Sequence, residues 1–188
     1  DGENIFYGYM FPYMGFSRTE SLSGITDSAA GATALACGVK TLNEYIGRDK
    51  DLNDLKSLTE LASELGKSAA VMSTEIENGA TPASFFAHAD SRSDTGMILR
   101  ASIAATQNYG TIIECGFDYY KLSYMSTIEG KIEDTLAKVS ANENGFFLMV
   151  EGACIDKHSH SNDMENMINR FEKKIYDLKT TRIISIQM

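Results

Sequence analysis

The sequence places a serine where a helix of very small residues is expected to begin. Asp27 and Ser28 immediately precede a run of mostly small residues that ends at Gly38. A hydroxyl in this position lies at the positive end of a helix dipole, which suits the binding of a phosphate or the stabilisation of a serine alkoxide. The same pattern also fits an ordinary Asp or Ser N-cap, so this stretch alone leaves both interpretations open.

A second group of candidates follows the apolar run at residues 146–150. Glu151 comes directly after it, where parallel strands of an open α/β sheet present their ligand-binding groups. Asp156 and His160 are spaced i, i+4, so in a helical turn they face the same way and offer one cation an oxygen and a nitrogen, which zinc accepts. A solvated surface pair remains the alternative interpretation.

A third group follows the short apolar run at residues 68–73. Thr81 and Pro82 are predicted to open a helix, with Thr81 as its cap and Pro82 at the first helical position. One short helix later, Arg92 can return a guanidinium to the same edge of the sheet and bind a phosphate bidentately. Taken singly, Arg92 also fits a surface arginine, and His88 fits a structural hydrogen-bonding role better than a ligand role.

Regular elements are needed to bring these groups together. An apolar stripe over residues 55–65 predicts a helix, with Asp54 as N-cap and Gly66 as C-cap, before a buried strand at residues 68–73. The alternation continues along the chain, because two further pairs of a helix and a strand are predicted, at residues 128–139 and 146–150 and at residues 167–178 and 182–186.

The order of elements predicts an α/β layered fold in which helices flank a mostly parallel central sheet. Residues 1–188 contain no linker and are expected to form a single domain, with 43% hydrophobic residues available for its core. The net charge of −9 argues against a basic nucleic-acid footprint. The apolar runs are too short to span a bilayer, so neither a membrane anchor nor an export signal is expected here.

Cysteine and histidine are scarce, which limits the metal sites that the chain can build. Cys37, Cys115 and Cys154 are widely spaced and show no CxxC pattern, so neither a disulfide framework nor a cysteine zinc site is indicated. With only three histidines in the chain, any metal site must depend heavily on carboxylates.

Taken together, the three groups resemble the alkaline phosphatase family, in order and in spacing, from about residue 11 to residue 178. The parts that look like the three motif blocks of that family are Thr26-Asp27-Ser28-Ala29-Ala30 with Gly38-Val39-Lys40-Thr41, then Ala80-Thr81-Pro82-Ala83 with Ser91-Arg92, then residues 146–156 with His160.

The resemblance implies a role for each candidate. Ser28 would be the nucleophile that becomes phosphorylated, Arg92 would hold the phosphate oxygens, and Asp27 would support Arg92 and bind beside the substrate. The implied cofactors are magnesium and zinc. Their implied ligands are Thr81 and Glu151 for magnesium, Asp156 and His160 for one zinc, and Ser28 for the second zinc.

Some expected family motifs are missing from these 188 residues. Residues 1–5 do not supply the early Gly-Asp-Gly motif, residues 182–188 contain no late Asp-His pair, and Gly79 stands where many members have His or Asp near the magnesium. We therefore expect an internal portion of an alkaline phosphatase, with an incomplete fold.

The expected function is hydrolysis of phosphate monoesters through a phosphoserine intermediate at a zinc and magnesium site, with the activity of this chain itself impaired. The alternative is a catalytically silent remnant that binds metal or phosphate weakly. A sulfatase or phosphodiesterase relative fits the motifs less well. The resemblance further implies small-molecule phosphate monoesters as substrates, a homodimer and a periplasmic or extracellular location, with neither nucleic acid nor membrane as partner.

Overall fold

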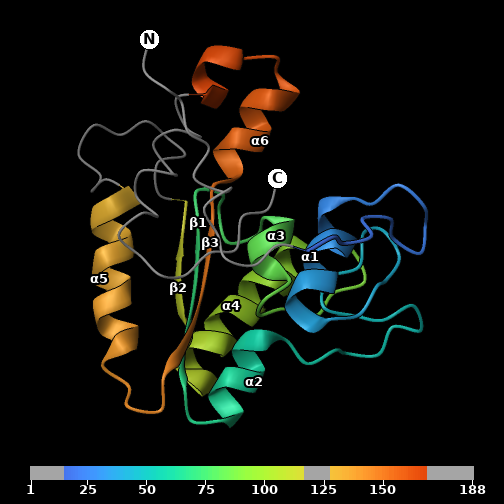
Figure 1. Cartoon of the computed structure of the whole chain (residues 1–188). Coiled ribbons are helices and arrows are strands. Elements are labelled where there is room, and N and C mark those ends of the chain that lie inside the picture. The colour runs from blue at the N-terminus through green and yellow to red at the C-terminus, as the bar shows by residue number, and fades with distance from the viewer. Residues whose placement is uncertain (1–14, 117–127, 169–188) are drawn as a thin grey trace.

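The computed structural model describes residues 15–116 and 128–168. Within these ranges two helices precede the first strand and one or two helices separate successive strands, so the chain passes repeatedly from one layer to the next (Figure 1). In chain order the elements are α1 (Ser28–Cys37), α2 (Leu58–Glu64), β1 (Ser68–Ser73), α3 (Ala80–Ala83), α4 (Thr95–Tyr109), β2 (Ile112–Cys115), α5 (Ile128–Ser140), β3 (Phe146–Glu151) and α6 (Ala153–His160).

The described strands form one sheet in the order β2-β1-β3, and both strand pairs are parallel. Ala70 in the central strand lies opposite Ile112 on one side and Leu148 on the other. The predicted α/β fold with a parallel sheet is therefore confirmed, and β1 and β3 occupy the predicted positions. Strand β2 was not predicted, because its four half-buried residues carry little pattern at an edge of the described sheet.

Alternate residues of the strands supply two separate apolar cores. Val71 and Met149 face the layer that contains helices α1 to α4, whereas Ala70 and Met72 pack with Leu148 against helix α5. Figure 1 shows α5 on one side of the sheet, α1 to α4 on the opposite side, and α6 at the top of the view, beyond the ends of the strands. Because successive side chains of a strand point to opposite faces, this pattern makes a three-layer arrangement.

Helix α2 begins later than the sequence predicted. Its N-cap is Ser57, which accepts a hydrogen bond from the Glu60 N–H while the Glu60 carboxylate accepts one from the Ser57 N–H. The predicted cap, Asp54, instead pairs with Arg48 at 2.7 Å. The reciprocal capping box at Ser57 satisfies two helix-terminal donors together, which explains why the helix begins there.

The predicted helices differ in how far the structure bears them out. In α5, Ile132 and Val139 of the predicted stripe are buried, but Leu58 of α2 is exposed, and so is Leu65, which is the C-cap of α2 in place of the predicted Gly66. Residues 164–168 are helical, which agrees with the predicted helix at residues 167–178 over the part of it that the structure describes. Residues 169–178 and the predicted strand at residues 182–186 lie outside the described residues. None of the described helices is long and apolar enough to cross a membrane.

A backbone bridge ties the loop after α1 to the segment that leads to Arg92. Ile46 and Ala89 exchange two backbone hydrogen bonds of 3.0 and 2.9 Å. Next to this bridge, the Gly47 carbonyl accepts a hydrogen bond from His88 Nδ1 at 2.9 Å. The close approach leaves no room for a side chain at Gly47, because an added Cβ would lie 2.2 Å from the Ala87 carbonyl oxygen.

We predict that Gly47→Ala lowers the free energy of unfolding by roughly 2–3 kcal/mol, since the new methyl group meets backbone atoms and the φ of +59° is unfavourable for alanine. Gly38→Ala is the matched control. Its φ is +73°, but no atom lies within 4 Å of the added Cβ, so only the backbone strain remains, about 1 kcal/mol. Urea unfolding measures both, and equal losses would contradict the clash.

The His88 side chain also makes the stability of the fold depend on pH. Its Nε2 lies 3.1 Å from Glu60 Oε1. Burial lowers the pKa of His88, but the hydrogen bonds to Glu60 and to the Gly47 carbonyl outweigh burial and raise that pKa above 6.5. Burial raises the pKa of Glu60, and its hydrogen bonds with His88 and Ser57 outweigh that effect and hold the pKa below 4.5.

Stabilisation by the His88 and Glu60 pair should therefore be complete between about pH 4.5 and pH 6.5, the ordinary pKa values of the two groups. It is lost as pH rises through the raised pKa of His88 and as pH falls through the lowered pKa of Glu60. We predict that His88→Gln costs about 1 kcal/mol more at pH 6 than at pH 9. Urea unfolding of both proteins at the two pH values measures this, and a pH-independent loss would contradict it.

Candidate functional site

Helix α1 begins at Ser28, as the sequence predicted, and Asp27 is its N-cap. The Asp27 Oδ1 atom accepts a hydrogen bond from the Ala30 N–H at 2.9 Å. The small residues of α1 allow close packing, since Ala29 and Ala32 are fully buried. Ser28 itself is exposed at the opening of the helix, where the dipole is positive.

The Arg92 guanidinium returns to the start of α1, although the two segments are far apart in sequence. Its Nη1 lies 3.5 Å from Asp27 Oδ2, and the side chain is 36% exposed. The Asp27 carboxylate therefore has two functions: one oxygen caps the helix and the other faces the arginine. This arrangement leaves the guanidinium partly open to an anion beside Ser28.

Two further predicted residues lie at the carboxyl ends of the strands. Glu151 is the last residue of β3, and its Oε2 accepts a hydrogen bond from Ser73 Oγ at the end of β1. Thr81 lies inside the short helix α3, whose N-cap is Gly79, so the prediction that Thr81 caps this helix is wrong. The helix begins one residue before Thr81, and Pro82 still lies within the first turn, where its missing N–H costs nothing.

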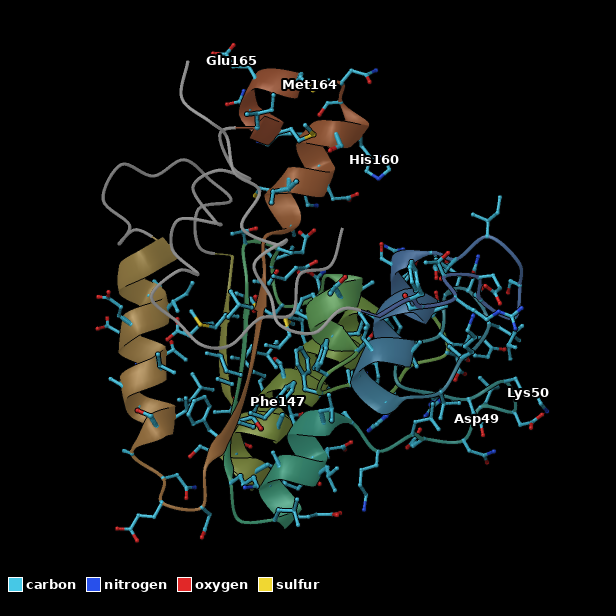
Figure 2. All side chains as sticks on the ribbon, viewed as in Figure 1. Asp49, Lys50, Phe147, His160, Met164 and Glu165 are labelled. Atoms are coloured by element: carbon cyan, nitrogen blue, oxygen red, sulfur yellow. The ribbon has the colours of Figure 1, made fainter. Side chains whose placement is uncertain are left out.

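Asp156 and His160 face the same way on helix α6, because four residues make about one helical turn. His160 Nε2 lies 3.5 Å from Asp156 Oδ2, and both side chains are mostly exposed. In the view of Figure 2, the His160 imidazole lies on the same side of α6 as helix α1. The pair therefore offers an oxygen and a nitrogen ligand toward the space between the two helices.

Every residue that the sequence predicted for the site lines one cavity of about 900 Å³. This cavity lies above the carboxyl ends of β1 and β3, between the N-terminus of α1 and helix α6. The predicted residues gathered there are Asp27, Ser28, Thr81, Arg92, Glu151, Asp156 and His160.

The cavity is lined by side chains whose donor atoms suit metal ions, but the described residues do not bring a complete set of ligands to one point. Carboxylate with imidazole suits zinc, and carboxylate with hydroxyl suits magnesium. Among the described residues, however, no three His, Cys, Asp or Glu side chains are placed to hold one ion. The cavity wall carries four carboxylates against two permanent cations, namely Asp27, Glu75, Glu151 and Asp156 against Arg92 and Lys157.

Sequence reasoning missed two charged residues of this cavity. Glu75 follows strand β1 almost directly, and its Oε2 lies 2.5 Å from Lys157 Nζ on helix α6. The rule that ligand-binding groups follow strand ends, which identified Glu151, would also have found Glu75. Lys157 lies beside Asp156 in the sequence, but the sequence gives no signal that it pairs across the cavity.

Two of the three thiols are poorly suited to nucleophilic chemistry. Burial raises the pKa of Cys37 to about 12, and the charge of Glu60 adds to the effect. Burial also raises the pKa of Cys115 to about 12, with Glu77 adding to it. A thiol with such a pKa stays protonated near neutral pH, so neither group is an activated nucleophile.

A protein-family model matches most of the chain. Residues 7–115 and 120–177 match the model of the alkaline phosphatase family. The chain belongs to the alkaline phosphatase family.

Two curated relatives come from Bacillus subtilis. Alkaline phosphatase 4 is 31% identical over 190 residues, which cover 74% of this chain and 41% of the relative. Alkaline phosphatase 3 is 26% identical over 199 residues, with coverage of 79% and 43%. The chain therefore spans about two fifths of the length of these alkaline phosphatases.

A solved structure shares the fold. The alkaline phosphatase from the Antarctic bacterium TAB5 superposes with a TM-score of 0.70 and 21% identity, over 95% of this chain and 68% of that protein. A variant of the TAB5 enzyme, with a TM-score of 0.69, has magnesium bound in its structure. At 21% identity, this likeness shows that the two chains share a fold.

The Glu75 side chain passes over Gly79, and this leads to a prediction. An added Cβ at Gly79 would lie 2.1 Å from Glu75 Cγ, so alanine there must push the Glu75 side chain away from Lys157. We predict that Gly79→Ala costs about 1–2 kcal/mol of stability. The loss should be smaller in a Glu75→Ala background, where the clash with Cγ is gone and the contacts of 3.1 Å with the Ile76 carbonyl oxygen and 3.2 Å with Cβ of residue 75 remain.

The matched control for this experiment is Gly96→Ala, because the nearest atom to its added Cβ is 3.4 Å away. Thermal unfolding of the single and double variants gives the coupling between positions 75 and 79. An equal loss for Gly79→Ala with and without the Glu75 side chain would show that Glu75 does not occupy this space.

Proposed function

We propose that this chain hydrolyses phosphate monoesters with impaired activity, and that the cavity beside Ser28 is its phosphate site. The observation that supports this most directly is that Ser28 and Arg92 line the same cavity, while Asp27 both caps the helix of Ser28 and pairs with Arg92. A hydroxyl at a helix N-terminus and a guanidinium on one cavity wall suit a tetrahedral anion. Membership of the alkaline phosphatase family supports the same reaction.

In the proposed reaction, Ser28 Oγ attacks the phosphorus atom while the bond between phosphorus and the ester oxygen breaks. The alcohol leaves with the bonding electron pair and takes up a proton, and Ser28 becomes phosphoserine. A water molecule then attacks the same phosphorus atom, which restores the Ser28 hydroxyl and releases inorganic phosphate. Throughout these steps the Arg92 guanidinium donates hydrogen bonds to the phosphate oxygens that do not react.

We propose zinc and magnesium as cofactors. Asp156 and His160 would contribute to one zinc, Ser28 to a second zinc, and Thr81 with Glu151 to magnesium. When bound, these cations lower the pKa of the attacking hydroxyl and neutralise the charge of the phosphate. The excess of carboxylates on the cavity wall supports a requirement for cations, because without them the wall repels a dianion.

A catalytically silent chain is the second candidate. It is favoured by one observation: within the described ranges, fewer than three metal-ligating side chains of the His, Cys, Asp and Glu types converge on any point. Such a chain would still bind phosphate through Arg92. Phosphate binding without turnover is the result that distinguishes it from the first candidate.

Small phosphate monoesters are the proposed substrates. The homodimer and the periplasmic or extracellular location are proposals that rest on the family resemblance. The absence of a nucleic-acid or membrane partner is a further proposal, which rests on the net charge of −9 and on the short apolar runs.

The test is release of a chromogenic phenol from its phosphate ester by the purified chain, supplied with zinc and magnesium. We predict metal-dependent release that falls at least about 10³-fold in Ser28→Ala, since the nucleophile is lost. Arg92→Ala should raise KM as well as lower kcat, because phosphate loses its guanidinium. Ser140→Ala, at an exposed position at the end of α5, is the matched serine control.

Three outcomes would contradict the proposal. Turnover that persists in Ser28→Ala would remove Ser28 as nucleophile. Failure of the chain to release phenol while it binds inorganic phosphate would favour the silent chain, and failure to do either would contradict both candidates.

A further inference from the structure

A short turn outside the cavity contacts both sides of the proposed phosphate site. The Asn43 side chain is hydrogen-bonded to the loop that precedes α1. Its Oδ1 accepts hydrogen bonds from Ser21 Oγ at 2.7 Å and from the Asp27 N–H at 3.3 Å. Its Nδ2 donates to the Ile25 carbonyl oxygen at 2.9 Å. Asn43 therefore holds the chain at the residue that caps the helix of Ser28.

The next residue, Glu44, bonds to both partners of the ion pair. Its N–H donates to Asp27 Oδ2 at 3.0 Å, and its carbonyl oxygen accepts the Arg92 N–H at 2.8 Å. Its carboxylate accepts a hydrogen bond from Ser91 Oγ at 3.2 Å. One peptide segment thus contacts the helix cap on one side and the arginine backbone on the other.

The backbone of Glu44 is in a conformation that side chains rarely adopt. Its φ is +75°, in the left-handed region that favours glycine. Such a conformation persists where surrounding contacts over-determine it, and it is common near functional sites. Here the hydrogen bonds to Asp27, Ser91 and Arg92 are those contacts, and a relaxed backbone at Glu44 would turn its N–H and carbonyl away from them.

We propose that the turn of Asn43 and Glu44 is a positioning element, which fixes the Arg92 guanidinium relative to Ser28 and so sets the affinity for phosphate. The inference rests on the proposed function for the identity of the anion. Neither residue lines the cavity among its described walls, so both act through Asp27 and Arg92. Loss of the Asn43 side chain frees the Asp27 backbone, and the Asp27 carboxylate then holds the guanidinium less firmly.

The test uses inorganic phosphate as the probe, titrated into the full 188-residue chain with magnesium and zinc present and followed by calorimetry. Asn43→Ala should weaken phosphate binding about tenfold, equivalent to about 1.4 kcal/mol. Asn53→Ala is the matched control, because the Asn53 side chain bonds to Asp49 in an exposed loop and should leave the affinity unchanged.

A double-mutant cycle separates positioning from general damage to the fold. In an Arg92→Ala background, Asn43→Ala should have no further effect on phosphate affinity, because its effect passes through the arginine. Ser23→Ala is a milder variant, since it removes the hydrogen bond of 3.0 Å from the Asn43 N–H. It should weaken phosphate binding in the same direction by a smaller factor, with a melting curve close to that of the wild type.

A second readout needs no phosphate. The heteronuclear NOE of the Arg92 Nε–Hε group reports how firmly the guanidinium is held, and it should fall in Asn43→Ala and Ser23→Ala but not in Asn53→Ala. Unchanged NOE values would overturn the inference, whatever the chain binds. Equal losses of phosphate affinity with and without Arg92 would also overturn it. If the wild type binds no phosphate while the NOE falls as expected, the positioning role stands and the proposed function fails.

Discussion

The site depends on one carboxylate that serves three partners. Asp27 caps helix α1 through the Ala30 N–H, accepts the Glu44 N–H, and lies 3.5 Å from the Arg92 guanidinium. The two oxygens of a carboxylate offer enough lone pairs for three partners, provided that the partners approach from different directions. That requirement couples the start of α1, the turn after α1 and the segment after α3, so the geometry around Ser28 is set by contacts between segments far apart in sequence.

The parallel sheet provides the second constraint. Parallel strands end at the same edge, and the groups that follow β1 and β3 are therefore brought together there. The Ser73 hydroxyl at the end of β1 donates to the Glu151 carboxylate at the end of β3, while Glu75 reaches across to Lys157. The resulting wall is acidic, and this excess of carboxylates supports the proposed requirement for cations.

Much of the fold was predictable because its signals are local. Continuous apolar runs predicted β1 and β3, and the Asp-Ser pair predicted the start of α1. The predictions failed where two local signals competed: the capping box at Ser57 prevailed over Asp54, and Gly79 rather than Thr81 precedes α3. Strand β2 was missed because four residues are too few to show a pattern, and pairing with β1 is what makes them a strand.

The sequence by itself determined which residue types follow each strand and open α1, because helix caps and apolar runs act over a few residues. On this basis the sequence predicted a set of separate residues, of which Asp27 is the first and His160 the last, and all of them line one cavity. Only the tertiary structure decided the pairing of Arg92 with Asp27, the pairing of Lys157 with Glu75, and the left-handed turn at Glu44. These are contacts between segments distant along the chain, and their geometry follows from packing that no local pattern records.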